Sequence, residues 1–242
     1  MKKIVFLSMF LLTIGFSQDL FESGLEAYKK GDYSKAAELF EKACNNGNTI
    51  ACSATGVLYE NGQGVKQDYH KAIKLYEKGC YGEQASGCTN LGVLIAEGKG
   101  TRQDYHKAEE MFRKGCDNRD ADSCNNLGVF YENGQGVKQD YSKAAEIYKK
   151  ACEYNNANCL NLGNLYKNGK GLKQDYYKAI KLYEMACDGG NAISCTLAGI
   201  LYEKGQGVGR DYHIAKELFG KACDLGLQPG CDFYKKLNEK GF

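Results

Sequence analysis

Apolar side chains recur along this chain with the spacing of one face of an α-helix. The first helical set is Cys52, Thr55, Gly56 and Tyr59, and the second is Tyr69, Ala72, Ile73, Tyr76 and Cys80. Both follow the i, i+3, i+4, i+7 rule. Between them, Gly62 and Gly64 can end the first helix in a left-handed conformation, and Asp68 can cap the second. The pattern predicts two antiparallel helices joined by a glycine-containing loop.

This helical hairpin is one unit of a repeat. Residues 123–151 closely repeat residues 51–79, and the unit recurs every 36 residues with a single step of 35. A fixed period of this size is typical of a stacked repeat array. We therefore expect an all-α solenoid. Its parts are a short-loop hairpin at 18–48, five repeats at 49–84, 85–120, 121–155, 156–191 and 192–227, and a capping helix at 228–242.

One glycine lies inside the first helix of every repeat. These glycines are Gly56, Gly92, Gly128, Gly163 and Gly199. Each costs about 1 kcal/mol relative to alanine in a helix interior. Their recurrence at one position predicts that a neighbouring helix approaches there too closely for a Cβ atom.

Twelve cysteines lie near the junctions between hairpins. Because a hairpin is antiparallel, Cys52 can meet Cys80 within its unit or Cys44 across the junction. The first scheme leaves Cys44 and Cys231 unpaired at opposite ends of the array, whereas the second pairs every cysteine. We predict the second scheme: Cys44–Cys52, Cys80–Cys88, Cys116–Cys124, Cys152–Cys159, Cys187–Cys195 and Cys223–Cys231. In the chain-entropy model, each short loop contributes about 2.5 kcal/mol.

Zinc binding is the alternative use of these cysteines. Zinc sites favour Cys-x-x-Cys with histidine nearby, but here six or seven residues separate the paired cysteines. His70, His106 and His213 share one repeat position, directly after the Asp-Tyr cap and far from the cysteine of the same helix. We expect structural disulfides, with no metal and no other cofactor.

Residues 1–17 have the pattern of a secretory signal peptide. A positive start precedes an apolar run from Ile4 to Phe16, and Gly15 and Ser17 offer small residues to a signal peptidase. The run is short for a transmembrane helix, and no cysteine at the cleavage site could carry a lipid. A buried N-terminal strand is the alternative. We expect export to the periplasm or the exterior, where disulfides form, without a membrane anchor.

The charge composition excludes some partners. The net charge is +2, and Lys2 and Lys3 account for it, so the chain beyond residue 17 is balanced. Nothing in that balance attracts nucleic acid or an anionic membrane. We expect a monomer that binds neither.

The unit Asn-Leu-Gly…Tyr…Gly-x-Gly-Val…Asp-Tyr-x-Lys-Ala…Tyr…Lys-Ala-Cys resembles the Sel-like repeat, a relative of the tetratricopeptide repeat. Together with the paired cysteines and the export signal, it makes essentially the whole mature chain similar to the Helicobacter cysteine-rich protein family. This resemblance implies a right-handed α/α superhelix with disulfides between cysteines a few residues apart. It also implies a β-lactamase or penicillin-binding activity.

The residues do not supply a known route for β-lactam hydrolysis. No serine is followed three residues later by lysine, and neither Lys-Thr-Gly nor Ser-Asp-Asn occurs. Three scattered histidines cannot form a zinc hydrolase site. The glycine loops follow helices, which is typical of turns rather than of a phosphate-binding cradle. An enzymatic function and its catalytic residues therefore remain open.

A binding surface is better supported by asparagines at one repeat position. Asn90, Asn126 and Asn161 precede Leu-Gly in three successive repeats, while Ala54 and Leu197 replace them in the flanking repeats. They resemble the inner-helix asparagine of tetratricopeptide repeats, and each carries a donor and an acceptor. The main hypothesis is a scaffold that binds a peptide, glycan or partner protein on its concave face. The alternative is a slow β-lactamase or penicillin-binding protein that hydrolyses β-lactam rings, with a β-lactam or a peptidoglycan-like molecule as its ligand.

Overall fold

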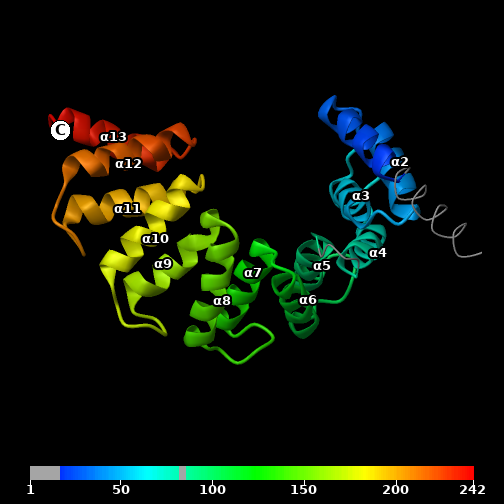
Figure 1. Cartoon of the computed structure of the whole chain (residues 1–242), viewed down its shortest axis with the longest axis horizontal. Helices are drawn as coiled ribbons and strands as arrows, with labels where there is room; N and C mark the ends of the chain where they lie inside the picture. Colours follow the sequence, from blue (N-terminus) through cyan, green and yellow to red (C-terminus); the bar gives the residue numbers. More distant parts are fainter. Residues whose placement is uncertain (1–16, 82–85) are drawn as a thin grey trace, which may run out of the picture. The chain divides into compact units, whose positions relative to one another are not determined.

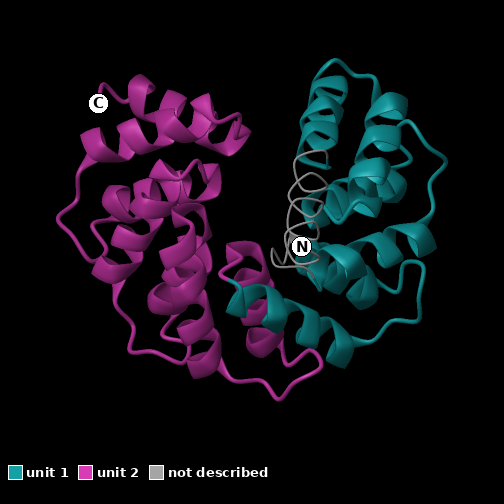
Figure 2. Cartoon of the chain, turned by 45° about the vertical axis from the view of Figure 1, so that its right-hand side comes forward, with its two compact units in different colours: residues 1–118 teal, residues 119–242 magenta. Residues whose placement is uncertain are grey.

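The computed structural model describes residues 17–81 and 86–242, and the chain divides into two compact units, residues 1–118 and 119–242 (Figure 1). Figure 2 colours these units teal and magenta. The predicted signal peptide lies outside the described residues except for Ser17. Among the described residues, no helix combines the length and apolarity needed to cross a membrane.

The described part of each unit is built from helices, which confirms the predicted all-α fold of stacked helix pairs. The first unit contains a helical segment at 17–29, α2 (Tyr33–Asn45), α3 (Thr49–Asn61), α4 (Tyr69–Cys80), α5 (Ser86–Glu97) and α6 (Tyr105–Asp117). The second contains α7 (Ala121–Asn133), α8 (Tyr141–Tyr154), the 3-10 helix η1 (Asn156–Asn158), α9 (Cys159–Asn168), α10 (Tyr176–Asp188), α11 (Ala192–Lys204), α12 (Tyr212–Asp224) and α13 (Gln228–Glu239). The right-handed sense of a superhelix stays a prediction.

Each repeat is an antiparallel hairpin whose ends follow from local sequence. We call α3, α5, α7, α9 and α11 the first helices, and α4, α6, α8, α10 and α12 the second helices. Helix α3 ends at Gly62, which adopts the left-handed conformation with φ 66°. Helix α4 begins after Asp68, whose carboxylate accepts a hydrogen bond of 2.9 Å from the backbone N–H of Lys71. Both features were predicted from the sequence.

In two loops, one in each unit, the second glycine lets a hairpin contact the preceding hairpin of the same unit. A Cβ added to Gly100 would lie 2.6 Å from the Cβ of Tyr69, in the first turn of α4. In the second unit, a Cβ on Gly207 would lie 2.5 Å from the Cβ of Tyr176, in the first turn of α10. These two loops therefore pack on the preceding second helix, and only glycine fits at these positions.

The glycine inside each first helix, hereafter the helix glycine, faces an aromatic ring from the second helix of its own hairpin. A Cβ on Gly56 would lie 2.6 Å from Cε1 of Tyr76. The other ring partners are Phe112 for Gly92, Tyr148 for Gly128, Tyr183 for Gly163 and Phe219 for Gly199. These rings are buried in their units. The predicted close approach is therefore confirmed, and the group that occupies the space is a side chain.

Disulfides join successive hairpins at the predicted junctions. The bridges are Cys44–Cys52 and Cys80–Cys88 in the first unit, and Cys152–Cys159, Cys187–Cys195 and Cys223–Cys231 in the second. Cys116 and Cys124 are disulfide-bonded as well, and no cysteine in the described chain is free. The alternative pairing of Cys52 with Cys80 is therefore wrong.

Candidate functional site

Buried tyrosine hydroxyls reach toward the C-terminal half of the first helices. The Tyr76 hydroxyl donates to Oε2 of Glu60 at 2.5 Å, and the Tyr148 hydroxyl donates to Oε2 of Glu132 at 3.0 Å. Both tyrosines are 0% exposed. Burial, reinforced by the neighbouring carboxylate, raises the pKa of both hydroxyls well above the usual value for tyrosine. They stay protonated, so they act as fixed donors and cannot serve as bases at neutral pH.

The partner of this hydroxyl changes with the repeat. The acidic residue four positions after the helix glycine becomes Lys167 in the fourth repeat, and there the Tyr183 hydroxyl donates to Oδ1 of Asn164 at 2.7 Å. In the second repeat the same position is Ala96, and the buried ring is Phe112, which has no hydroxyl. Each hydroxyl therefore has a partner because a buried unsatisfied hydroxyl would be costly. These tyrosines pack the hairpins, as the sequence predicted.

The three candidate asparagines are half-buried and lie on α5, α7 and α9. Within the first unit, the amide of Asn90 offsets part of the rise in the pKa of the Tyr76 hydroxyl. Within the second unit, Nδ2 of Asn161 donates to Oδ1 of Asn125 at 2.8 Å, from α9 to α7. The hydrogen-bond partner of Asn161 is thus Asn125, the residue directly before the candidate Asn126. Each amide keeps further donor or acceptor capacity after one such bond.

The described residues offer few groups for catalysis. No group of three or more histidine, cysteine, aspartate or glutamate side chains in the described ranges could hold a metal ion. His70, His106 and His213 are exposed in the first turns of their helices, as expected. With every described cysteine oxidised, the described part of the chain also offers no thiol nucleophile.

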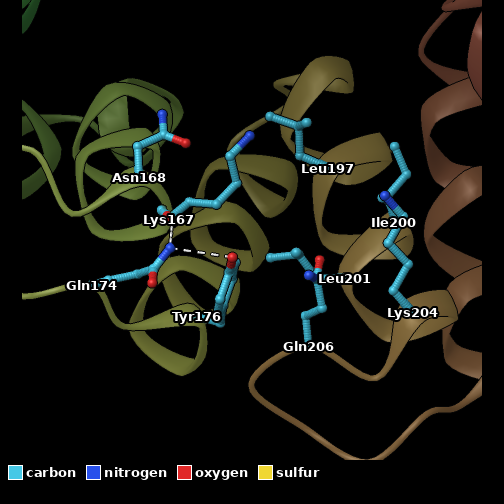
Figure 3. Close-up of a pocket in the computed structure, with 9 residues that line it drawn as sticks. All are labelled: Lys167, Asn168, Gln174, Tyr176, Leu197, Ile200, Leu201, Lys204 and Gln206. Atoms are coloured by element: carbon cyan, nitrogen blue, oxygen red, sulfur yellow. Dashed lines mark hydrogen bonds between the residues drawn. The ribbon is translucent and has the colours of Figure 1, made fainter.

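An open pocket of about 370 Å³ lies in the second unit between the ends of α9 and α11 (Figure 3). Lys167 and Asn168 line it from α9, Gln174 lines it from the α9–α10 loop, and Tyr176 lines it from the first position of α10. From the other side it is lined by Leu197, Ile200, Leu201, Lys204 and Gln206. Nε2 of Gln174 donates to the Lys167 carbonyl at 2.9 Å and to the Tyr176 hydroxyl at 3.2 Å, which ties the α9–α10 loop to its helices.

The pocket was not predicted from the sequence, although alignment of the repeats contains a signal for it. Two positions before the helix glycine, Leu197 stands where three repeats have asparagine, and one position after it, Ile200 stands where three repeats have valine. Lys167 replaces glutamate or alanine, and Lys204 replaces asparagine or glutamate. At this pocket, Leu197 thus puts an apolar side chain at a position that is polar in three other repeats, and Lys167 and Lys204 add two positive charges.

Stacked helical hairpins without a recognisable catalytic cluster in the described residues define a helical-repeat scaffold. The Sel1 repeat family matches residues 15–48, 49–82, 85–120, 121–156, 159–191 and 192–227. The chain therefore belongs to the Sel1 repeat family.

Solved structures share this fold. A Sel1 repeat protein from Oxalobacter formigenes has a TM-score of 0.78 and 28% identity, with 91% of this chain and 98% of that chain covered. The protein c5321, a protective antigen of uropathogenic Escherichia coli, has a TM-score of 0.76 and 27% identity, with 93% of this chain and 54% of that chain covered.

Curated relatives match shorter segments. "Putative beta-lactamase HcpE" of Helicobacter pylori strain J99 is 56% identical over 43 residues, and "Putative beta-lactamase HcpD" of strain 26695 is 38% identical over 47 residues. These alignments cover 18% and 19% of this chain, but only 12% and 15% of the relatives. They support the predicted resemblance to the cysteine-rich Helicobacter proteins.

Proposed function

We propose that this chain is an exported, disulfide-braced Sel1-repeat scaffold that binds a peptide or a partner protein through its first helices. One observation carries the proposal: half-buried amides recur at the same position of three first helices, at Asn90, Asn126 and Asn161. An amide that is held by the scaffold and still has a donor or acceptor to offer suits an extended ligand, whose backbone needs both. The disulfides favour an oxidising compartment, either the periplasm or the exterior.

A random peptide library displayed on phage, selected against the purified oxidised protein, tests the proposal. Binding of a selected peptide is then compared between the wild type and the triple variant Asn90→Ala/Asn126→Ala/Asn161→Ala. Each lost hydrogen bond is worth about 0.5–1.5 kcal/mol, so the triple variant should bind at least about tenfold more weakly. The matched control substitutes three exposed asparagines elsewhere, in Asn61→Ala/Asn133→Ala/Asn238→Ala.

The melting temperature separates binding from scaffolding. Asn161 loses its bond to Asn125 in the triple variant, so a moderate loss of stability, about 1 kcal/mol for that bond, is expected. If the triple variant melts far lower, or binds as tightly as the wild type, these asparagines are scaffold and the proposal fails. It also fails if the control variant loses binding equally, or if no peptide is selected.

Hydrolysis of β-lactams is the second function to test, because the matched segments belong to proteins named "Putative beta-lactamase HcpE" and "Putative beta-lactamase HcpD". A chromogenic cephalosporin and the purified protein suffice. Turnover that survives a chelator and disappears in the triple asparagine variant would favour hydrolysis over simple binding. Absence of turnover would leave the binding scaffold.

A further inference from the structure

The pocket between α9 and α11 differs in charge from the equivalent surface of the other repeats. None of the 9 residues that line it is acidic, and two of them, Lys167 and Lys204, are cationic. In the described part of the chain, neither lysine forms an ion pair. Lys170, Lys178, Lys181 and Lys221 of the same unit all lie within 4 Å of a carboxylate. The pocket therefore carries positive charge that its surroundings leave uncompensated.

The same pocket has an aliphatic side. Leu197 and Ile200 are partly exposed in it, and Leu201, 3% exposed, lies behind them. Figure 3 shows these three residues on the α11 side, across from Lys167 and Asn168 on α9. Covering aliphatic surface with an apolar side chain lowers the free energy, whereas the hydroxyl groups of a sugar would find no hydrogen-bond partner on that surface. This favours a peptide over a glycan.

From this combination we infer that the pocket binds a peptide segment in which an aspartate or glutamate stands beside an aliphatic residue. The carboxylate meets Lys167 and Lys204, the aliphatic side chain covers Leu197 and Ile200, and the amide of Asn168 is available to the peptide backbone. The inference rests on the proposed binding function and names the class of ligand. The proposed binding site for this class of peptide lies in the second unit alone.

A structural role for the two lysines makes a different prediction. Each lies in the last turn of its helix, where a cation also interacts favourably with the helix dipole. If that were their whole role, their loss would lower stability and leave peptide binding unchanged. Binding and stability must therefore be measured on the same variants.

The fold itself supplies suitable substitutions. Lys167→Glu installs the residue found at the equivalent positions Glu60, Glu132 and Glu203. Lys204→Asn installs the residue found at Asn61, Asn133 and Asn168. The double variant should therefore fold. The control Lys138→Glu/Lys150→Gln changes the charge of the same unit equally, at two exposed lysines outside the pocket.

Phage selection from the random peptide library on the full oxidised chain is the test. We expect selected peptides to be enriched in aspartate or glutamate next to leucine, isoleucine or valine. A synthetic peptide from that set should bind Lys167→Glu/Lys204→Asn at least about tenfold more weakly, equivalent to about 1.4 kcal/mol, and the control variant as tightly as the wild type. Replacing its acids by amides should have a similar effect, and added salt should weaken binding.

The outcomes separate this inference from the proposed function. Peptides that show no acidic enrichment, or that bind the lysine double variant as tightly as the wild type, overturn the inference. If such peptides still lose binding in the asparagine triple variant, the proposed function stands alone. Selection of no peptide overturns both. Selective binding of anionic sugars on a glycan array, without peptide binding, likewise overturns the inference.

Discussion

Replacing Gly56 by alanine should destabilise the protein, although alanine is the better helix former. An added Cβ would lie 2.6 and 2.7 Å from Cε1 and Cδ1 of the Tyr76 ring. Carbon atoms in contact normally lie about 3.5–4.0 Å apart, so the ring would have to move by about 1 Å. That movement is resisted because Tyr76 is 0% exposed and its hydroxyl is bonded to Glu60 at 2.5 Å.

The expected magnitude is a difference between two effects. Overpacking a well-packed core costs about 1–3 kcal/mol, and the buried, hydrogen-bonded Tyr76 ring puts this site in the upper part of that range, at about 2–3 kcal/mol. The helix preference of alanine returns about 1 kcal/mol. A net loss of about 1–2 kcal/mol should lower the melting temperature of a chain this size by roughly 2–8 °C. The shift is measured with the disulfides intact, by thermal and urea unfolding followed by circular dichroism.

The same substitution at Gly220 is the matched control. Gly220 lies inside α12, and a Cβ there would meet only Tyr234 ring carbons at 3.4 Å, an ordinary contact. Gly220→Ala should therefore be neutral or stabilise by up to about 1 kcal/mol. In a Tyr76→Leu background, Gly56→Ala should cost less than it does in the wild type. The reasoning is refuted if Gly56→Ala is as stable as the wild type, or if both glycine variants shift stability in the same direction.

Three further predictions concern the scaffold. Asn164→Val should cost about 1–3 kcal/mol because it leaves the buried Tyr183 hydroxyl without its partner, and Asn164→Val/Tyr183→Phe should recover most of that loss in urea unfolding. Burial raises the pKa of Tyr76, Tyr148 and Tyr183 above the ordinary value of 10.0, so the unfolded chain loses these protons at a lower pH than the folded chain does. The free energy of unfolding should therefore keep its full value below about pH 10. Above about pH 10 it should fall by up to about 1.4 kcal/mol per tyrosine per pH unit. A urea midpoint that does not change across pH 10 would contradict this. Thiol titration of the denatured, unreduced protein should give close to zero, and reduction, but not a chelator, should lower the melting temperature strongly; two reactive thiols per chain would contradict the pairing.

Features that depend on neighbours along the chain could be predicted from the sequence. The helical faces follow from apolar spacing, and the cap at Asp68 follows from an oxygen that reaches an N–H three residues later. The disulfides also qualify, because only six or seven residues lie between the bonded cysteines and parity distinguishes the two schemes. Each involves a short segment whose conformation the local residues already specify.

Tertiary structure decided which side chains meet between helices. The sequence predicts that Tyr183 is buried, but only the packed hairpin shows that its hydroxyl reaches Asn164, 19 residues away. Likewise, the Asn161 amide donates a hydrogen bond to Asn125 rather than to Asn126, because the placement of α9 beside α7 decides which side chain lies within hydrogen-bonding distance.

The pocket shows the same limit. Lys167 and Lys204 lie in different repeats, at positions that differ by one residue relative to the helix glycine, so repeat alignment alone does not pair them. Stacking of α11 after the α9–α10 hairpin brings both to one pocket together with Leu197 and Ile200. The sequence by itself determined the helices, their ends and their covalent links, because those interactions are local. The charge and shape of the candidate binding surface depend on how side chains from separate repeats are placed in space, and only the packed structure decides that.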